Sequence, residues 1–180
     1  MTRKLFTTLL QISAILFIVT NVYSQSSSHS GTFYRIPTNS NLEISGDITM
    51  EAWVRPNSGN GNLYNIAMKG NYGYGFGILS NGRVMFWKTG SQAAGPTSTG
   101  TIPQDGSTWT HVAVSIDRGT LATFYINGVS AGTASTTNAT YQVMSGDLSI
   151  GTQGGCNCNS FNGLIDEVRI WNDVRTAGEI

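Results

Sequence analysis

The acidic side chains of this chain are poorly spaced for glycoside hydrolysis, which in retaining enzymes needs two carboxyl groups about 5–5.5 Å apart. Glu43, Asp47 and Glu51 are four residues apart, with a predicted turn among them. Asp166 and Glu167 are adjacent on a predicted strand, so alternation directs their side chains to opposite faces. We therefore expect no carboxylate pair and no catalytic residue.

His111 is a candidate general base, because alternation places it on the same strand face as Ser115 and Asp117. A serine nucleophile is exposed on a sharp strand-to-helix turn, and no serine of this sequence stands in such a context. A single histidine within a strand is more often structural. We therefore predict that the protein is not an enzyme.

Asp166 is predicted to share a strand face with Leu164, Val168 and Ile170. An unpaired carboxylate on an apolar face is costly in free energy, and two arrangements would remove that cost. The carboxylate could bind Ca²⁺ together with backbone carbonyls, since hard cations prefer oxygen ligands. It could instead accept hydrogen bonds from backbone N–H groups or pair with an arginine.

The two cysteines, Cys156 and Cys158, are separated by one residue. Two ligands do not make a zinc site, and the Cys-x-Cys spacing differs from that of zinc-binding motifs. We expect a disulfide that shapes a surface loop beside the binding rim. The loop must curl, because bridged Cα atoms lie about 4.4–6.8 Å apart. Free or intermolecular thiols are the alternative.

Aromatic and amide side chains in glycine-rich segments are the candidates for ligand binding, since sugars are held by aromatic faces and by polar donors and acceptors. The candidates are Asn62, Tyr64, Tyr72, Tyr74 and Trp87, on or beside predicted rim loops. Trp53, Trp109 and Trp171 lie in strand segments and are predicted to belong to the core. The predicted binding surface is therefore the loop rim of the domain.

The elements that must position these residues are short strands. Charged residues make up 11% of the 180, against roughly 25% in an average soluble protein. Twenty-two glycines against four prolines indicate strands joined by tight turns, and the length is that of one domain. The formal net charge is zero, without a Lys/Arg block, which argues against nucleic acid as a partner.

Residues 1–24 are predicted to be a cleaved signal peptide, because Arg3 and Lys4 precede a mostly apolar stretch and residues 22–24 suit a signal peptidase. A membrane anchor is the alternative, but polar residues interrupt the stretch, which falls short of the ~20 apolar residues of a bilayer span. We therefore expect a secreted or cell-surface protein with a flexible lead-in over residues 25–31. We also expect no transmembrane segment after cleavage, and surroundings in which disulfides persist.

Hydrophobic alternation of period two organises the rest of the chain. Over residues 48–55 it predicts a strand with Ile48, Met50, Ala52 and Val54 on one face. Further predicted strands cover residues 75–79, 83–88, 109–117, 121–126, 129–133, 148–151 and 164–171. Asn81-Gly82 predicts a type I′ hairpin turn, and Thr176 with Glu179 predicts a capping box. Short strands at this spacing predict an all-β sandwich.

Four motifs resemble those of the laminin G-like domains, whose jelly-roll fold is that of the concanavalin A-like lectins and glucanases. They are Ile48–Pro56 (ITMEAWVRP), Trp109–Ala113 (WTHVA), Phe124–Gly128 (FYING) and Phe161–Asn172 (FNGLIDEVRIWN). The resemblance covers residues 32–180, extends more distantly to the pentraxins, and is typical of secreted proteins of the Bacteroidota. It implies an all-β, two-sheet antiparallel jelly-roll sandwich of about a dozen strands.

For function, the resemblance implies a non-catalytic module that binds an extracellular glycan or glycoprotein, or serves adhesion, within a longer protein that carries further domains. A structural spacer is the alternative. A glycoside hydrolase-related domain is disfavoured, because laminarinase-like enzymes of this fold carry two Glu and an Asp on alternate strand residues. Many such domains hold one structural Ca²⁺, which would make Asp166 a ligand. Residues 30–37 and 152–159 nevertheless lack the acidic residues expected to complete that site.

Overall fold

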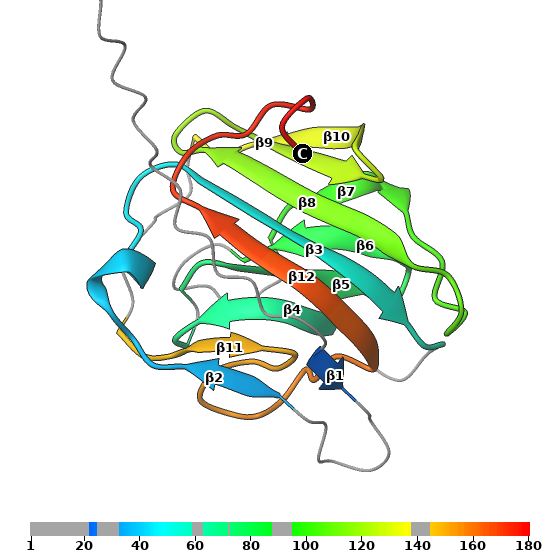
Figure 1. Cartoon of the computed structure of the whole chain (residues 1–180). Helices are drawn as coiled ribbons and strands as arrows, with labels where there is room; N and C mark the ends of the chain where they lie inside the picture. Colours follow the sequence, from blue (N-terminus) through cyan, green and yellow to red (C-terminus); the bar gives the residue numbers. More distant parts are fainter. Residues whose placement is uncertain (1–21, 25–32, 59–62, 72, 88–94, 138–144) are drawn as a thin grey trace, which may run out of the picture.

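The computed structural model describes residues 22–24, 33–58, 63–71, 73–87, 95–137 and 145–180, and these form an almost entirely β structure (Figure 1). The strands are β1 (Val22–Ser24), β2 (Tyr34–Ile36), β3 (Ile48–Pro56), β4 (Leu63–Lys69), β5 (Gly75–Leu79), β6 (Arg83–Phe86), β7 (Thr97–Thr101), β8 (Thr110–Asp117), β9 (Leu121–Ile126), β10 (Val129–Ser135), β11 (Leu148–Ile150) and β12 (Gly163–Trp171). A short 3₁₀ helix, Ser40–Leu42, lies between β2 and β3. No helix in the described part of the chain is long and apolar enough to cross a membrane.

Two antiparallel sheets of six strands each form a sandwich. The first sheet has the order β1-β12-β3-β8-β9-β10, and the second has the order β2-β11-β4-β5-β6-β7. In Figure 1 the first sheet runs diagonally across the front of the molecule, and strands β4 to β7 of the second sheet lie behind it. Strands distant in sequence are neighbours in each sheet, as in a jelly roll. The predicted two-sheet jelly-roll sandwich is therefore confirmed.

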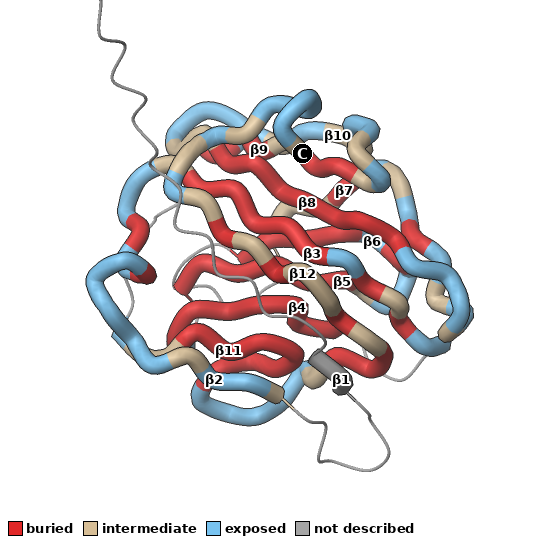
Figure 2. Tube along the Cα trace, in the orientation of Figure 1, coloured by how far each residue is buried: buried red, intermediate tan, exposed pale blue. Residues whose placement is uncertain are grey.

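The apolar faces of the two sheets pack against each other to form one core. In β3, the side chains of Ile48, Met50, Ala52 and Val54 are fully buried, as the alternation predicts. Phe86 of the second sheet meets Phe124 of the first at a ring-centroid distance of 6.0 Å. Figure 2 shows the buried residues running along the inner strands and the exposed residues along the loops and ends. The fold therefore leaves the loop rim and the outer sheet faces for binding.

The turn between β5 and β6 differs from the prediction. A type I′ turn needs positive φ at both central residues, and only Gly82 of the predicted pair has it, at 82°. The N–H of Gly82 donates to the carbonyl of Leu79 at 2.8 Å, so that a loop of three residues, 80–82, closes the hairpin. The type I′ pattern occurs instead at Asn127-Gly128, with φ of 50° and 74°.

One extra residue in β12 alters the alternation of that strand. Its pairing with β3 passes from Asp166 opposite Trp53 to Arg169 opposite Glu51. Three steps along β12 therefore match two along β3, and Glu167, at a φ of 48°, is the additional residue. A bulge of this kind moves every later side chain to the other face.

The bulge corrects the predicted orientation of Asp166. Val168 and Ile170 are buried in the core, each 2% exposed, but Asp166 lies opposite the outward-facing Trp53 and is only partly buried. The prediction that Asp166 shares a face with Val168 and Ile170 is wrong. Asp166 needs no partner to offset burial in an apolar core, because it lies on the outer face of the first sheet.

Two strands of the second sheet escaped prediction. Leu63–Lys69 is a fully buried strand, β4, and its sequence LYNIAMK shows no clean alternation. Thr97–Thr101, β7, is a threonine-rich edge strand without large apolar residues. Period-two patterning arises where one face is buried and the other is solvated. Strand β4 is buried on both faces, and β7 has no large apolar residues whose alternation could reveal it.

Candidate functional site

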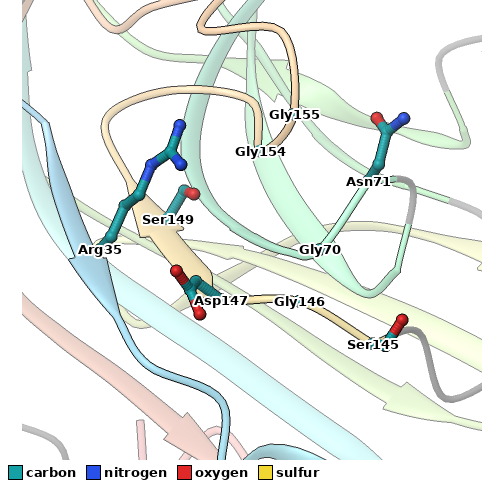
Figure 3. A pocket seen from close by; sticks show the side chains of 9 residues that line it. All are labelled: Arg35, Gly70, Asn71, Ser145, Gly146, Asp147, Ser149, Gly154 and Gly155. Carbon is teal, nitrogen blue, oxygen red and sulfur yellow. The ribbon is translucent and has the colours of Figure 1, made fainter.

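A polar hollow of about 330 Å³ opens beside the β2 edge of the second sheet (Figure 3), and we call it the rim hollow. It is lined by Arg35, Gly70, Asn71, Ser145, Gly146, Asp147, Ser149, Gly154 and Gly155. Its volume is at the lower end of the range for small-ligand pockets, about 300–1,000 Å³. Three loops and two strands far apart in sequence meet here.

Strand pairing places Arg35 of β2 directly opposite Ser149 of β11. Leu148 and Ile150 flank Ser149 and are buried in the core. Alternation therefore directs Ser149 and its cross-strand partner to the outer face of the second sheet. Figure 3 shows the two side chains next to each other over β11, with Asp147 at the start of that strand.

Two neighbours hold the guanidinium group of Arg35. It lies 5.3 Å from the ring centroid of Phe33, and its Nη2 donates to Oδ1 of Asn157 at 2.6 Å. Asn157 stands between the two cysteines of the predicted disulfide, which is present with Cα atoms 5.2 Å apart. No carboxylate in the described part of the chain pairs with Arg35 within 4 Å. The guanidinium is therefore oriented while its charge is not neutralised by an ion pair.

Glycines bring the backbone of three loops together at the floor of the hollow. A Cβ atom at Gly154 would clash with the carbonyl oxygen of Gly70, and one at Gly146 would press against the Cα of Gly70. The N–H of Gly70 donates to the carbonyl of Asp147 at 2.8 Å. Only residues without side chains allow this approach, which leaves a floor of backbone groups.

A buried lysine supports the same wall of the hollow. Lys69 is 1% exposed, and its Nζ donates to Oγ1 of Thr38 at 2.7 Å and to the carbonyl of Gly146. Burial lowers the pKa of Lys69, against the opposing effect of the nearby carboxylates of Glu43 and Asp147. Oδ1 of Asp147 accepts from the N–H of Thr38 at 3.3 Å. These contacts hold Thr38 and Gly146 in place at the edge of the hollow.

The three predicted binding residues that the structure describes, Tyr64, Tyr74 and Trp87, do not line this hollow. Tyr64, Tyr74 and Trp87 are buried, with 3%, 6% and 4% of their surface exposed, so the prediction that they stand on an exposed rim is wrong. Asn62 and Tyr72 lie outside the described residues. Asn71, one residue before Tyr72, does line the hollow.

Each buried aromatic has a structural partner. Tyr64 lies within β4 and packs edge-on against Phe161, with ring centroids 6.2 Å apart. Nε1 of Trp87 donates to Oδ1 of Asn65 at 2.6 Å. The prediction placed Tyr64 on or beside a rim loop because Asn and Gly residues surround it, whereas β4 extends over this position.

Replacing Tyr74 by phenylalanine should lower the free energy of unfolding by about 1–2 kcal/mol without weakening ligand binding. The Tyr74 hydroxyl donates to the carbonyl of Leu42 at 3.1 Å in a buried setting, and its loss leaves that carbonyl unpaired. Chemical denaturation of the variant measures the change. Tyr34→Phe is the matched control, since Tyr34 is 46% exposed and should change stability little. A binding loss in Tyr74→Phe at unchanged stability would contradict this assignment.

The strand tryptophans lie differently from the prediction. Trp53 and Trp109 are each 38% exposed, and Trp171 is partly buried. Trp53 faces outward because its neighbours Ala52 and Val54 face the core. The prediction that these tryptophans belong to the core is therefore wrong, and they lie on or beside the outer face of the first sheet.

The sequence did not predict that one carboxylate on that outer face, Glu51, is buried. Glu51 is 2% exposed. Its Oε1 accepts from Nε1 of Trp171 at 2.8 Å and lies 3.7 Å from Nη1 of Arg169, and its Oε2 lies 3.1 Å from Nε2 of His111. Alternation along β3 and β8 could have indicated this cluster, because it directs Glu51, Trp53 and His111 to the same outer face. Strand pairing then places His111 opposite Trp53 and beside Glu51. We call these four residues the Glu51 network.

The Glu51 network does not extend into a nucleophilic triad. The hydroxyl of Ser115 is engaged with Oγ1 of Thr49 at 2.9 Å and with the N–H of Arg175 at 3.0 Å. Arg169 occupies the space between Glu51 and Glu167, since it pairs with both. The carboxylates that glycoside hydrolysis would need are thus tied to an arginine in this arrangement.

The surroundings of Asp166 offer few of the ligands that calcium requires. Ca²⁺ takes six to eight oxygen ligands, and Oδ1 of Asp166 already accepts from the N–H of Glu167 at 2.8 Å. No cluster of three or more His, Cys, Asp or Glu side chains suited to a metal occurs among the described residues. These residues alone do not supply a calcium site, and calcium binding at Asp166 stays a prediction.

Solved structures share the fold at low sequence identity, although the sequence matches no curated protein. A Bacteroides ovatus protein named as a candidate carbohydrate-binding protein is 17% identical with a TM-score of 0.67, covering 91% of this chain and 46% of its own. The CBM40 domain of the Ruminococcus gnavus IT-sialidase, bound to α2,3-sialyllactose, is 16% identical with a TM-score of 0.67. The match covers 91% of this chain and 95% of the CBM40 chain. The binding domain of botulinum neurotoxin DC in complex with SialylT is 16% identical with a TM-score of 0.62. The match covers 87% of this chain and 40% of the neurotoxin chain.

These likenesses concern the fold, and the chain spans less than half the length of the Bacteroides ovatus structure. The sequence itself carries a family match. The model of the family Laminin_G_3, described as the concanavalin A-like lectin/glucanases superfamily, matches residues 28–180. The chain therefore belongs to the Laminin_G_3 family of concanavalin A-like domains, as its four motifs predict.

Proposed function

We propose that this protein is a non-catalytic extracellular module that binds a glycan, or a glycoprotein carrying it, at the rim hollow. The observation that carries the proposal is Arg35. Its guanidinium group is exposed, is held in place by Phe33 and Asn157, and has no carboxylate partner in the described part of the chain. The exposed amide of Asn71 and the backbone floor supply donors and acceptors for hydroxyl groups.

The charges of the hollow favour an acidic sugar. A guanidinium group binds a carboxylate through two parallel hydrogen bonds, which gives both geometry and affinity. Arg35 is the only cation among the described residues that line the hollow, and no carboxylate in the described part of the chain lies within 4 Å of it. The Ruminococcus gnavus domain of the same fold, which binds α2,3-sialyllactose, supports this ligand class.

The absence of catalysis is part of the proposal. The solved structures of the same fold include domains described by binding, and Arg169 pairs with both Glu51 and Glu167. Residues 1–24 act as a signal peptide in this proposal, with export to the cell surface or medium, and the domain serves adhesion or glycan binding within a longer protein.

A glycan array probed with the exported protein tests the proposal. We expect binding to sialylated or uronic acid-containing glycans, measured once with calcium and once with a chelator. Loss of binding in the chelator would assign a role to calcium, and loss of the calcium effect in Asp166→Ala would assign that role to Asp166. Binding to no glycan and no matrix glycoprotein would favour a structural spacer. Polysaccharide hydrolysis that disappears in Glu51→Gln or Glu167→Gln would overturn the non-catalytic assignment.

A further inference from the structure

We propose a second glycan subsite, separate from the rim hollow, where the indole of Trp53 stacks against an uncharged hexopyranose ring on the outer face of the first sheet. A hollow of about 330 Å³ lies against Trp53. Its lining is formed by Trp53, His111, Asn127, Gly128, Arg169 and Ile180. No residue is shared with the rim hollow.

Trp53 has the position of a stacking platform. It stands in the middle of β3 with 38% of its surface exposed, so part of the side chain is accessible to a ligand. The His111 ring packs beside it, with centroids 5.4 Å apart and planes tilted by 57°. The C–H groups of a pyranose ring carry partial positive charge and are attracted to the electron-rich face of an indole.

Polar groups stand around the platform at hydrogen-bonding positions. Oδ1 of Asn127 accepts from the backbone N–H of His111 at 3.0 Å, which fixes the amide and leaves its NH₂ group as a donor toward a ligand. The rigid type I′ turn at Asn127-Gly128 holds this amide at the edge of the hollow. Arg169 has five N–H donors, of which its contacts with Glu51 and Glu167 use only part. A flat apolar face ringed by donors is the arrangement that suits a sugar.

The charges of this subsite favour a neutral ligand, unlike those of the rim hollow. Arg169 is flanked by two carboxylates, those of Glu51 and Glu167, so no uncompensated positive charge is available for an anion. A carboxylate-bearing sugar would instead meet the negative charge of Glu167, which is 43% exposed at its side chain. The two hollows therefore differ in ligand class.

Binding of methyl β-D-galactopyranoside to the full chain tests this inference. Binding is monitored through the shifts of the indole N–H resonances in ¹H–¹⁵N spectra during the titration. A small neutral ligand of this size binds with a dissociation constant of roughly 1 mM or weaker. We expect Trp53→Ala to weaken binding at least about tenfold and Trp53→Phe to retain part of it. Trp109→Ala is the matched control, since Trp109 is equally exposed at 38% but does not line the hollow, and it should bind as the wild type does.

The outcomes separate this subsite from the rim hollow. Arg83→Ala, at an exposed arginine that lines neither hollow, should leave galactoside binding unchanged. The corresponding methyl galacturonide should bind the Trp53 hollow more weakly than the galactoside does. Equal loss in Trp53→Ala and Trp109→Ala, unchanged binding in Trp53→Ala, or no indole shift at roughly 50 mM galactoside would overturn the inference. If Trp53→Ala fails to fold, the Trp53→Phe titration decides, because an unchanged affinity without the indole also overturns it.

Discussion

Replacing Glu51 by alanine is expected to lower the free energy of unfolding by about 3–5 kcal/mol, since removing one partner from a buried charged network leaves the others uncompensated. Glu51 is 2% exposed. Its carboxylate accepts a hydrogen bond from Nε1 of Trp171 and lies close to His111 and Arg169. Urea denaturation followed by tryptophan fluorescence measures the change. Glu51→Gln keeps an acceptor for Trp171 and should cost less, about 1–3 kcal/mol.

The contribution of Glu51 to the free energy of unfolding should depend on pH. Burial alone would raise the pKa of Glu51, but hydrogen bonds from His111 and Trp171 and the charge of Arg169 outweigh it, so the pKa lies below its usual value of 4.5. A carboxyl whose pKa is lowered by folding stabilises the fold fully above pH 4.5, and that contribution is lost as the pH falls through the folded-state pKa. The stability gap between wild type and Glu51→Gln should therefore shrink in acid.

Glu43→Gln is the control for the Glu51 variants, because Glu43 is an exposed carboxylate outside the network. It should change stability little, as most surface substitutions do. A loss below about 1 kcal/mol in Glu51→Ala would show that the network contributes little to folding. A gap between wild type and Glu51→Gln that stays constant down to pH 3 would show that folding does not lower the pKa of Glu51.

Replacing Arg35 by alanine should weaken binding of an acidic glycan by roughly 10- to 150-fold, because hydrogen bonds to a charged group are worth about 1.5–3 kcal/mol. Arg35 is exposed and carries no ion pair in the described part of the chain, so folding stability should stay close to that of the wild type. Calorimetric titration with a glycan selected on the array measures the affinity, and thermal unfolding checks the fold.

Two further variants sharpen the Arg35 test. Arg35→Lys keeps the charge but loses the planar fork, and it should bind with intermediate affinity if the ligand carboxylate is held by two hydrogen bonds. Arg83→Ala is the matched control, since Arg83 is an exposed arginine of β6 that does not line the rim hollow. Equal weakening in Arg35→Ala and Arg83→Ala would indicate a general charge effect and would contradict a site at the rim hollow.

Local pattern was sufficient to predict strands in which apolar residues alternate with other residues along the sequence. The strands Ile48–Pro56 and Leu121–Ile126 follow the predicted alternation. The capping contact of Thr176 with Glu179 is also present, with Oε2 of Glu179 accepting the N–H of Thr176 at 2.9 Å. In each case the interacting residues are close in sequence, so short-range rules apply.

The binding surface was beyond the reach of the same rules. Tyr64 and Trp87 have the composition of rim residues, yet long-range packing buries both. Arg35 appeared as an ordinary residue of an early strand, and its role emerges only because β2 pairs with β11 and the loop of Cys156 and Cys158 supplies Asn157. Neither contact has a signature in the local sequence.

The amino-acid order thus determined the class of fold, the family and the disulfide, because hydrophobic period, turn residues and the spacing of two cysteines act over a few positions. Tertiary structure alone decided which face each β12 side chain takes, since a single extra residue at Glu167 inverts the alternation. It also decided where ligands can bind, because the rim hollow joins Arg35, Gly70 and Ser149. These residues become neighbours only when the strands of the second sheet pair out of sequence order.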